Sequence, residues 1–262
     1  MCFALRIGRA PPAPCLLASF TLKWKAFVMN VNGTMSIIRI WDLPTRLFHW
    51  ALVLCMIGLF VTGKIGGNAM NWHFRLGYAA LALVLFRAIW GFIGGHWSRF
   101  VRFFPTPAGV LRYIKGRTRP EDKAGHNPLG ACSVLALLSL TAAQAVTGLF
   151  SYDEIAFAGP LTGLVSEASV SQATSYHKAW GQYLLIALVA LHVLAIIVYS
   201  VRKHGLLWPM IVGDKMLDVD LPSARDTAAT RVMALSVLVI LAAAVYALVE
   251  WGNAQGTAGF GY

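Results

Sequence analysis

Charged residues are scarce in this chain. Asp, Glu, Lys and Arg make up 13% of its 262 residues, against about 25% in ordinary soluble domains. Hydrophobic residues make up 58%, and the mean hydropathy is +0.64. This composition excludes an ordinary soluble domain and predicts a membrane protein.

Acidic residues are especially few, with 11 Asp and Glu against 22 Lys and Arg and a net charge of +11. Such a balance also occurs in nucleic-acid-binding proteins. Here the basic residues lie between long apolar segments, so their distribution follows membrane topology. We therefore exclude nucleic acid and expect membrane lipid as the partner of the basic segments.

The chain lacks a C-x-x-C pair, since its four cysteines are Cys2, Cys15, Cys55 and Cys132. It therefore has no C-x-x-C-H sequence, the motif that attaches haem covalently in c-type cytochromes. Any haem bound by this chain is expected to be b-type, held by ligation and packing alone.

Five segments are apolar for long enough to cross a bilayer, which takes about 20 residues per helix. They predict an all-α membrane protein, with a four-helix transmembrane bundle and a fifth, C-terminal transmembrane helix. The first segment is expected to start a few residues earlier, where Asp42 or Thr45 can cap the helix. The segments are residues 47–63, 74–95, 128–152, 177–201 and 232–251.

Basic residues indicate which side of the membrane each connection occupies. Most of the 22 Lys and Arg residues lie in three places. They precede the first segment, lie between the second and third segments, or surround the connection from the fourth segment to the fifth. By the positive-inside rule we expect a multi-pass protein of the bacterial inner membrane, with a cytoplasmic N-terminus and a periplasmic C-terminus. Six tryptophans near segment ends are expected among the lipid headgroups: Trp41, Trp50, Trp72, Trp97, Trp180 and Trp251.

Four histidines, His49, His73, His177 and His192, lie near the ends of these segments. An ionisable side chain inside a membrane span is costly to bury and points to function, and neutral imidazole is a common ligand of haem iron. Depth alone pairs His73 with His177 near the outer surface and His49 with His192 near the inner one. The pattern predicts two b haems stacked across the membrane.

Glycines and arginines near these histidines are further candidates for haem contact. Gly77 and Gly181 each follow a histidine by four residues, so they share its helix face and let a porphyrin approach the backbone; helix packing is the alternative. Arg87, inside the second segment, is expected to pair with a propionate of the inner haem or to extend to the membrane surface. Arg46, three residues before His49, has the alternatives of a propionate contact and interface anchoring.

His126 lies at the cytoplasmic edge of the third segment, four residues before Gly130. Its depth favours an interfacial role over iron ligation. A surrogate ligand and a wall of a quinone pocket are the alternatives.

An ordered set of motifs extends from residue 38 to residue 213. These motifs resemble the prokaryotic cytochrome b561 family, which includes the cytochrome b subunits of membrane-bound hydrogenases. The residues concerned are Trp41-Asp42-x-Pro44-x-Arg46-x-x-His49-Trp50, His73-x-x-x-Gly77-Tyr78, Arg87-x-x-Trp90-Gly91, His126-Asn127-Pro128-x-Gly130-Ala131, Thr147-Gly148-Leu149-Phe150, Gly159-Pro160-Leu161, His177-Lys178 and Leu191-His192.

The resemblance implies two non-covalent b haems, with ligands at the four histidines already singled out. It also implies electron transfer between membrane quinone and a partner such as a soluble cytochrome or a redox-enzyme subunit. The haem-binding domain is expected at residues 35–213, followed at 214–262 by a cytoplasmic linker, the fifth helix and a short outer tail. Residues 1–34 form an N-terminal extension, and Met35 is the expected functional start.

Three functions are open on this evidence. The leading one is an inner-membrane dihaem cytochrome b of the respiratory chain; whether it is itself a quinone oxidoreductase is left open. The second is a cytochrome b anchor subunit of a hydrogenase or similar redox complex. The third is a proton-coupled transporter with intramembrane histidines, which would show no haem absorption and lacks the acidic residues that such relays usually add.

Deleting residues 1–34 is expected to leave a membrane-inserted, haem-loaded protein, because the family-like sequence begins after them. A reduced-minus-oxidised spectrum of membranes containing the truncated chain measures this. Failure of that chain to accumulate with haem would contradict the prediction.

Overall fold

The computed structural model describes residues 35–202 and 205–259, so the expected extension at 1–34 lies outside the described residues. Five helical segments of the described part are long and apolar enough to cross a membrane. This confirms the predicted all-α membrane fold. The long helices are α2 (Leu43–Ile65), α3 (Met70–Ile93), α7 (Pro128–Leu149), α9 (Gly181–Val201) and α11 (Ala228–Gly259).

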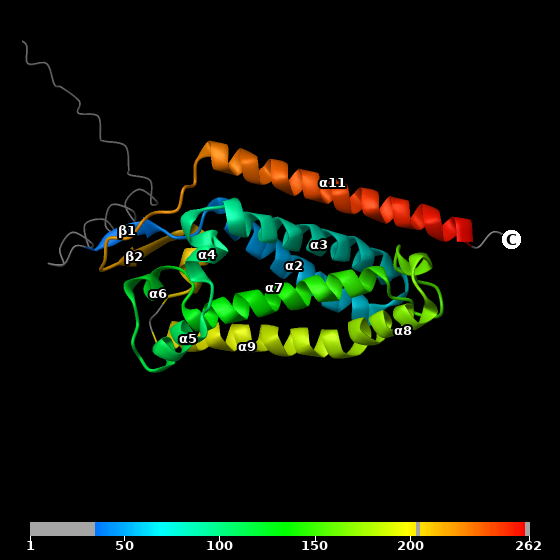
Figure 1. Cartoon of the computed structure of the whole chain (residues 1–262), viewed down its shortest axis with the longest axis horizontal. Helices are drawn as coiled ribbons and strands as arrows, with labels where there is room; N and C mark the ends of the chain where they lie inside the picture. Colours follow the sequence, from blue (N-terminus) through cyan, green and yellow to red (C-terminus); the bar gives the residue numbers. More distant parts are fainter. Residues whose placement is uncertain (1–34, 203–204, 260–262) are drawn as a thin grey trace, which may run out of the picture.

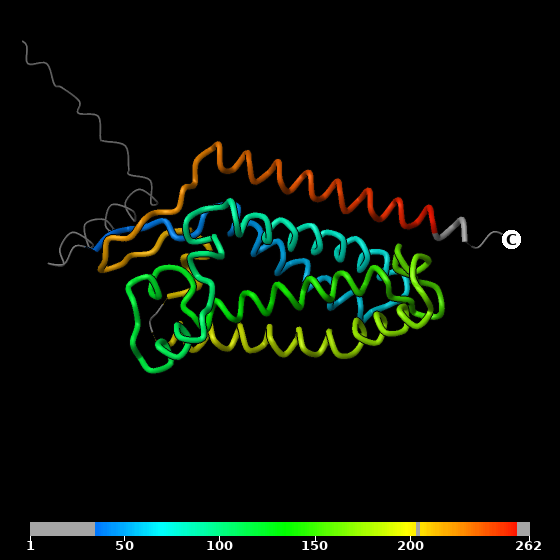
Figure 2. Tube along the Cα trace, in the orientation of Figure 1, coloured from blue at the N-terminus to red at the C-terminus, as the bar shows by residue number. Residues whose placement is uncertain are grey.

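Four of the long helices form a bundle, in which α2 packs on α3, α3 on α7 and α7 on α9. Helix α11 lies along the outside of this bundle, where it packs mainly on α3 (Figure 1). The trace in Figure 2 shows that the connections gather at the two ends of the bundle. The predicted division into a four-helix bundle and an additional C-terminal helix thus matches the architecture.

Polar side chains set where two of the helices begin. Helix α2 starts at Leu43, a few residues before the apolar segment as expected, because Asp42 accepts a hydrogen bond from the Thr45 amide. Asn127 caps α7 in the same way by accepting from the Gly130 amide. These side chains satisfy amides that have no partner inside the helix.

One end of the bundle, which we name the sheet end, carries a two-stranded antiparallel sheet. Strand β1 (Ser36–Arg39) pairs with β2 (Asp214–Leu217), so the linker after residue 213 returns to the start of the described chain. The sequence patterns did not predict this sheet. Short helices surround it: η2 (His96–Ser98), α4 (Phe100–Phe103), α5 (Pro107–Ile114), α6 (Pro120–Ala124) and α10 (Leu207–Val212).

The sheet end has a small hydrophobic core of its own. Trp41 and Trp97 are each 6% exposed and pack with Ile38, Leu217 and Ala224. The Trp97 indole also donates a hydrogen bond to the carbonyl of Pro222. The expectation that these two tryptophans lie among lipid headgroups is therefore wrong, because the linker and β1 cover them.

The opposite end holds the connection between α7 and α9. This connection contains η3 (Thr162–Leu164) and α8 (Glu167–Ser175). The short helix η1 (Gly67–Ala69), between α2 and α3, lies at the same end. Helix α8 continues through a π-helical turn, η4 (Tyr176–Trp180), directly into α9. His177 thus lies within a π turn in a longer helical stretch, and π turns frequently occur at functional sites.

Asp42 joins three parts of the sheet end and is fully buried. Besides the Thr45 amide at 2.8 Å, its carboxylate accepts from the Trp90 indole at 3.2 Å, the Gly95 amide at 3.0 Å and the Ser98 hydroxyl at 3.2 Å. A buried carboxylate is stable only when such donors satisfy it. The carboxylate thereby fixes the start of α2 against the end of α3.

Replacing Asp42 with Leu is expected to destabilise the fold by several kcal/mol, since each buried donor left without an acceptor costs about 1–3 kcal/mol. Asp42→Asn keeps the size and one acceptor oxygen, so its loss should be smaller. Thermal denaturation in detergent measures both changes. Asp218→Leu is the control, because Asp218 is exposed and forms only a 3.5 Å surface pair with Lys123; equal losses at positions 42 and 218 would contradict the prediction.

Candidate functional site

His73 and His177 meet inside the bundle near the end opposite the sheet. His73 comes from α3 and His177 from the π turn η4. Their ring centres are 6.1 Å apart, and the ring planes are nearly perpendicular, at 89°. The structure thus brings together the two histidines that depth had paired.

Each of these imidazoles is oriented by a main-chain carbonyl. Nδ1 of His73 lies 3.0 Å from the carbonyl oxygen of Leu59, and Nδ1 of His177 lies 2.8 Å from that of Gln144. Because a carbonyl can only accept, Nδ1 carries the proton in both rings. Nε2 then keeps its lone pair, which is the tautomer that a metal-ligating histidine adopts in such an arrangement.

The spacing of the two rings fits a shared metal ion. Imidazoles that coordinate one metal from opposite sides have ring centres about 6 Å apart, because each metal–nitrogen bond is about 2 Å long. Glycines leave room for both rings: an added Cβ would lie 3.2 Å from His73 Cε1 at Gly63 and 2.9 Å from His177 Cε1 at Gly148. Neither glycine was predicted to have this role, although both end a Val-Thr-Gly sequence that could have indicated it.

His49 and His192 come from α2 and α9 and lie nearer the sheet end. The two side chains are close enough to interact electrostatically. Nδ1 of His49 is buried and has no hydrogen-bond partner among the described residues. Within residues 35–202 and 205–259, no group of three or more His, Cys, Asp or Glu side chains could hold a metal ion, so the candidate ligands come as pairs.

His126 lies beside this second pair. Its ring packs between Trp41 and Phe103, at centroid distances of 4.7 and 4.5 Å. Burial lowers the pKa of His126 to about 3, and the neighbouring Arg87 and the second histidine pair add to the effect, so the ring is neutral at neutral pH. Its Nδ1 is buried without a hydrogen-bond partner in the described part of the chain.

Arg87 is 3% exposed, so the alternative in which it extends to the membrane surface is wrong. Its guanidinium carbon lies 4.9 and 5.9 Å from the ring centres of Phe100 and Phe103. Nη1 and Nη2 are both buried, and neither has a hydrogen-bond partner among the described side chains and backbone. A buried guanidinium with donors to spare suits a negatively charged group of a ligand.

The other three candidates have different surroundings. An added Cβ at Gly77 would meet only Leu59, at 3.9 Å, an ordinary van der Waals contact, so Gly77 is loosely packed among the described residues. Gly181 is packed against Gln144 and Tyr176, which corrects the expectation that its backbone faces a porphyrin. Arg46 donates to the carbonyl of Ile211 at 2.7 Å and lies 3.9 Å from Asp226, so it anchors α2 to α10 and to the linker.

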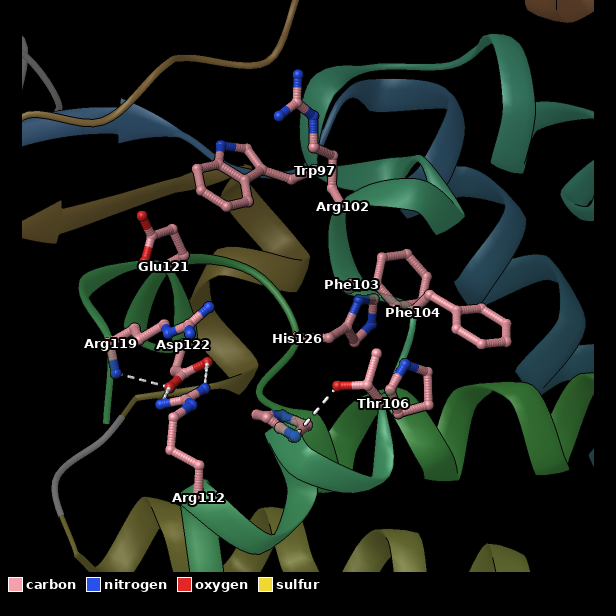
Figure 3. Close-up of a pocket in the computed structure, with 13 residues that line it drawn as sticks. Trp97, Arg102, Phe103, Phe104, Thr106, Arg112, Arg119, Glu121, Asp122 and His126 are labelled. Atoms are coloured by element: carbon pink, nitrogen blue, oxygen red, sulfur yellow. Dashed lines mark hydrogen bonds and ion pairs between the residues drawn. The ribbon is translucent and has the colours of Figure 1, made fainter. Parts of the chain in front are cut away.

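A cavity of 210 Å³ opens at the sheet end beside His126 (Figure 3). In the close-up, Phe103 and Phe104 lie near the imidazole, while Arg112 and Asp122 form an ion pair at the other side. The cavity thus combines aromatic side chains with polar groups, as small-molecule sites commonly do.

A model of the prokaryotic cytochrome b561 family matches residues 40–213. Over 220 residues the chain is 28% identical to a probable Ni/Fe-hydrogenase B-type cytochrome subunit of Azotobacter vinelandii, covering 71% of this chain and 91% of the relative. A similarly named protein of Cupriavidus necator is 27% identical over 196 residues, covering 60% and 78%. The probable Ni/Fe-hydrogenase 1 B-type cytochrome subunit of Escherichia coli K12 is 26% identical over 141 residues, covering 44% and 60%. No solved structure matches.

The matched region contains all four helices of the bundle and all four candidate ligands, and it ends before α11. B-type cytochromes hold haem through axial side chains and packing, which buried imidazoles in a helix bundle can provide. The chain therefore belongs to the prokaryotic cytochrome b561 family and is a multi-pass membrane cytochrome that binds haem b for electron transport.

Proposed function

We propose that the chain is the cytochrome b subunit of a membrane-bound Ni/Fe-hydrogenase or similar redox complex, and that it carries electrons from that partner to membrane quinone through two b haems. The observation that carries the proposal is the pair His73–His177, with ring centres 6.1 Å apart and both Nδ1 atoms on carbonyls. Bound haem iron supplies one-electron redox chemistry. The protein supplies ligands, orientation and a low dielectric.

The names of the relatives favour the hydrogenase-type complex over a free-standing carrier between quinone and a soluble cytochrome, which the sequence analysis had placed first. The relatives from Azotobacter vinelandii, Escherichia coli K12 and Cupriavidus necator are all named as probable Ni/Fe-hydrogenase B-type cytochrome subunits. Co-purification of a nickel- and iron-containing enzyme with the full chain from native membranes tests this assignment. A chain that always purifies alone, with full haem content, would support the free-standing carrier instead.

We assign the second haem to His49 and His192, nearer the sheet end. The buried, unpartnered Nδ1 of His49 and the electrostatic interaction between the two side chains support this assignment. The positive charge of Arg87 helps to lower the pKa of the neighbouring His126. Two buried guanidinium nitrogens of Arg87 have no hydrogen-bond partner among the described residues. A propionate of this inner haem is the anionic group that Arg87 would bind.

The cavity beside His126 is the proposed quinone site. A quinone has two carbonyl oxygens that accept hydrogen bonds and a flat ring that stacks on aromatic side chains. His126 has an unused buried nitrogen, and Phe103 and Phe104 supply aromatic surfaces in the same cavity. Placed there, a quinone would receive electrons from the inner haem.

The proposed location is the bacterial inner membrane, with the N-terminus and the sheet end in the cytoplasm. Support comes from the basic residues of the connection between α3 and α7, which surrounds the sheet end. The C-terminus is then periplasmic, because α11 runs to the opposite end (Figure 1). Positive connections are retained on the cytoplasmic side.

Alanine substitutions of the four histidines test the dihaem arrangement. His73→Ala and His177→Ala should each remove the outer haem and keep the inner one, whereas His49→Ala and His192→Ala should do the converse, because a low-spin haem needs both axial ligands. Haem content and a redox titration of each purified variant measure the losses. Loss of the same haem from His73→Ala and His192→Ala would show that the pairing is wrong, and a wild-type protein without a haem spectrum would favour the transporter alternative.

Arg87→Leu should lower the midpoint potential of the inner haem more than that of the outer haem. Removing a nearby positive charge makes the oxidised, more positive iron less unfavourable, and a low local dielectric enlarges the effect. Redox titration of the two haems measures both potentials, and Arg75→Leu is the control because Arg75 is exposed beside Trp72. Equal shifts of the two haems in Arg87→Leu would rule out a propionate partner at this residue.

His126→Ala should keep both haems, because the four proposed ligands are elsewhere, but should slow quinone reduction. Haem content, the reduced-minus-oxidised spectrum and quinone reductase activity measure these effects. Loss of one haem from this variant would mean that His126 is a ligand. Unchanged activity would remove His126 from the quinone site.

A further inference from the structure

A short sequence pattern occurs twice in the bundle, once beside each outer histidine. Residues 59–63 on α2 read Leu-Phe-Val-Thr-Gly, and residues 144–148 on α7 read Gln-Ala-Val-Thr-Gly. In both copies a threonine and a glycine follow the first residue by three and four positions. On an α-helix, residues at these spacings share one face.

The first copy contacts His73. The Leu59 carbonyl accepts hydrogen bonds from His73 Nδ1 at 3.0 Å and from the Thr62 hydroxyl at 3.3 Å. Gly63, one turn further along α2, leaves only 3.2 Å between an added Cβ and the Cε1 of His73. We name Leu59, Thr62 and Gly63 the first clamp.

The second copy contacts His177 in the same way. The Gln144 carbonyl accepts from His177 Nδ1 at 2.8 Å and from the Thr147 hydroxyl at 3.2 Å, and an added Cβ at Gly148 would lie 2.9 Å from His177 Cε1. The Gln144 side chain also donates to the His177 carbonyl at 2.7 Å. We name Gln144, Thr147 and Gly148 the second clamp.

Each clamp restricts its imidazole in two ways. The carbonyl sets the direction of the Nδ1–H bond, and the glycine leaves room for the ring, because a side chain there would press on its Cε1. Hydrogen-bond partners of this kind commonly orient metal-ligating histidines. Because the clamps are on different helices, each sets its ring plane separately, and the resulting angle between the planes is 89°.

We propose that the two clamps are positioning elements that hold the axial imidazole planes of the outer haem perpendicular to each other. The inference rests on the proposed ligand pair His73 and His177. Perpendicular ligand planes leave two d orbitals of low-spin ferric iron nearly equal in energy, which gives a highly anisotropic EPR signal with one large g value. Planes that turn towards parallel separate these orbitals, and the signal becomes rhombic with a smaller maximum g value.

EPR of the oxidised, full-length holoprotein tests the proposal. The outer-haem signal is identified as the one missing from His73→Ala, and it is expected to be highly anisotropic in the unsubstituted protein. In Gly63→Ala and Gly148→Ala the added methyl group should turn the adjacent ring and lower the maximum g value of this signal. The inner-haem signal should not change and is the internal reference. Alanine favours a helix more than glycine does, so the helices are retained.

Thr147→Val supplies a milder change without adding volume. It removes the 3.2 Å contact of the hydroxyl with the Gln144 carbonyl, together with the shorter, 2.7 Å hydrogen bond to the Ala143 carbonyl. Its matched control is Thr141→Val on the same helix, where the hydroxyl bonds to the Leu137 carbonyl at 2.7 Å. A shift of the outer-haem signal in Thr147→Val and none in Thr141→Val is expected. If alanine at 148 expels the outer haem, Gly63→Ala decides by the same measurement, since its contact is longer.

Two results would overturn the proposal and leave the ligand assignment intact: a rhombic outer-haem signal in the unsubstituted protein, or an unchanged anisotropic signal in both glycine variants with haem retained. A third result, loss of the same haem from His73→Ala and His192→Ala, would remove the assigned ligand pair and with it both the dihaem arrangement and the clamp proposal. The substitutions at 63 and 148 therefore separate failure of the clamps from failure of the proposed function.

Discussion

The burial of one carboxylate holds the sheet end together. Asp42 is fully buried, and its oxygens accept from the first turn of α2, the end of α3 and η2. Gly95 must lack a side chain there, because an added Cβ would collide with the carboxylate. Arg87, also buried, interacts with the same carboxylate electrostatically. A buried charge needs such partners. Because they fix the first turn of α2, they also set the position of His49, two turns further along the helix.

The meeting of His73 with His177 could be predicted from sequence because it depends only on depth along helices of known rise. The five membrane segments depend only on the length of apolar runs. The sheet could not be predicted, because β1 and β2 are four residues each and far apart in the chain. The burial of Trp41 and the different surroundings of Gly148 and Gly181 also could not be predicted. They depend on how the helices pack against one another, and spacing within a single helix gives no information about that packing.

The two histidine pairs have different electrostatic surroundings. His73 and His177 are oriented by main-chain carbonyls, whose dipoles are fixed and do not titrate. The pair nearer the sheet end interacts with the neutral imidazole of His126, which in turn neighbours Arg87. A positive neighbour favours the reduced form of an iron centre. With the proposed ligand set, this asymmetry favours electron transfer towards the sheet end, where the cavity lies.

The sheet also constrains the order in which the molecule is made. Arg39 in β1 donates a hydrogen bond to Asp214 in β2 at 2.6 Å, and the two residues are 175 positions apart in the chain. Synthesis proceeds from the N-terminus at about 5–20 residues per second, so β1 waits many seconds for its partner while α2, α3, α7 and α9 are produced. Closure of the sheet end is therefore a late step of biogenesis, and until then Trp41 and Trp97 lack the cover that β2 and the linker later provide.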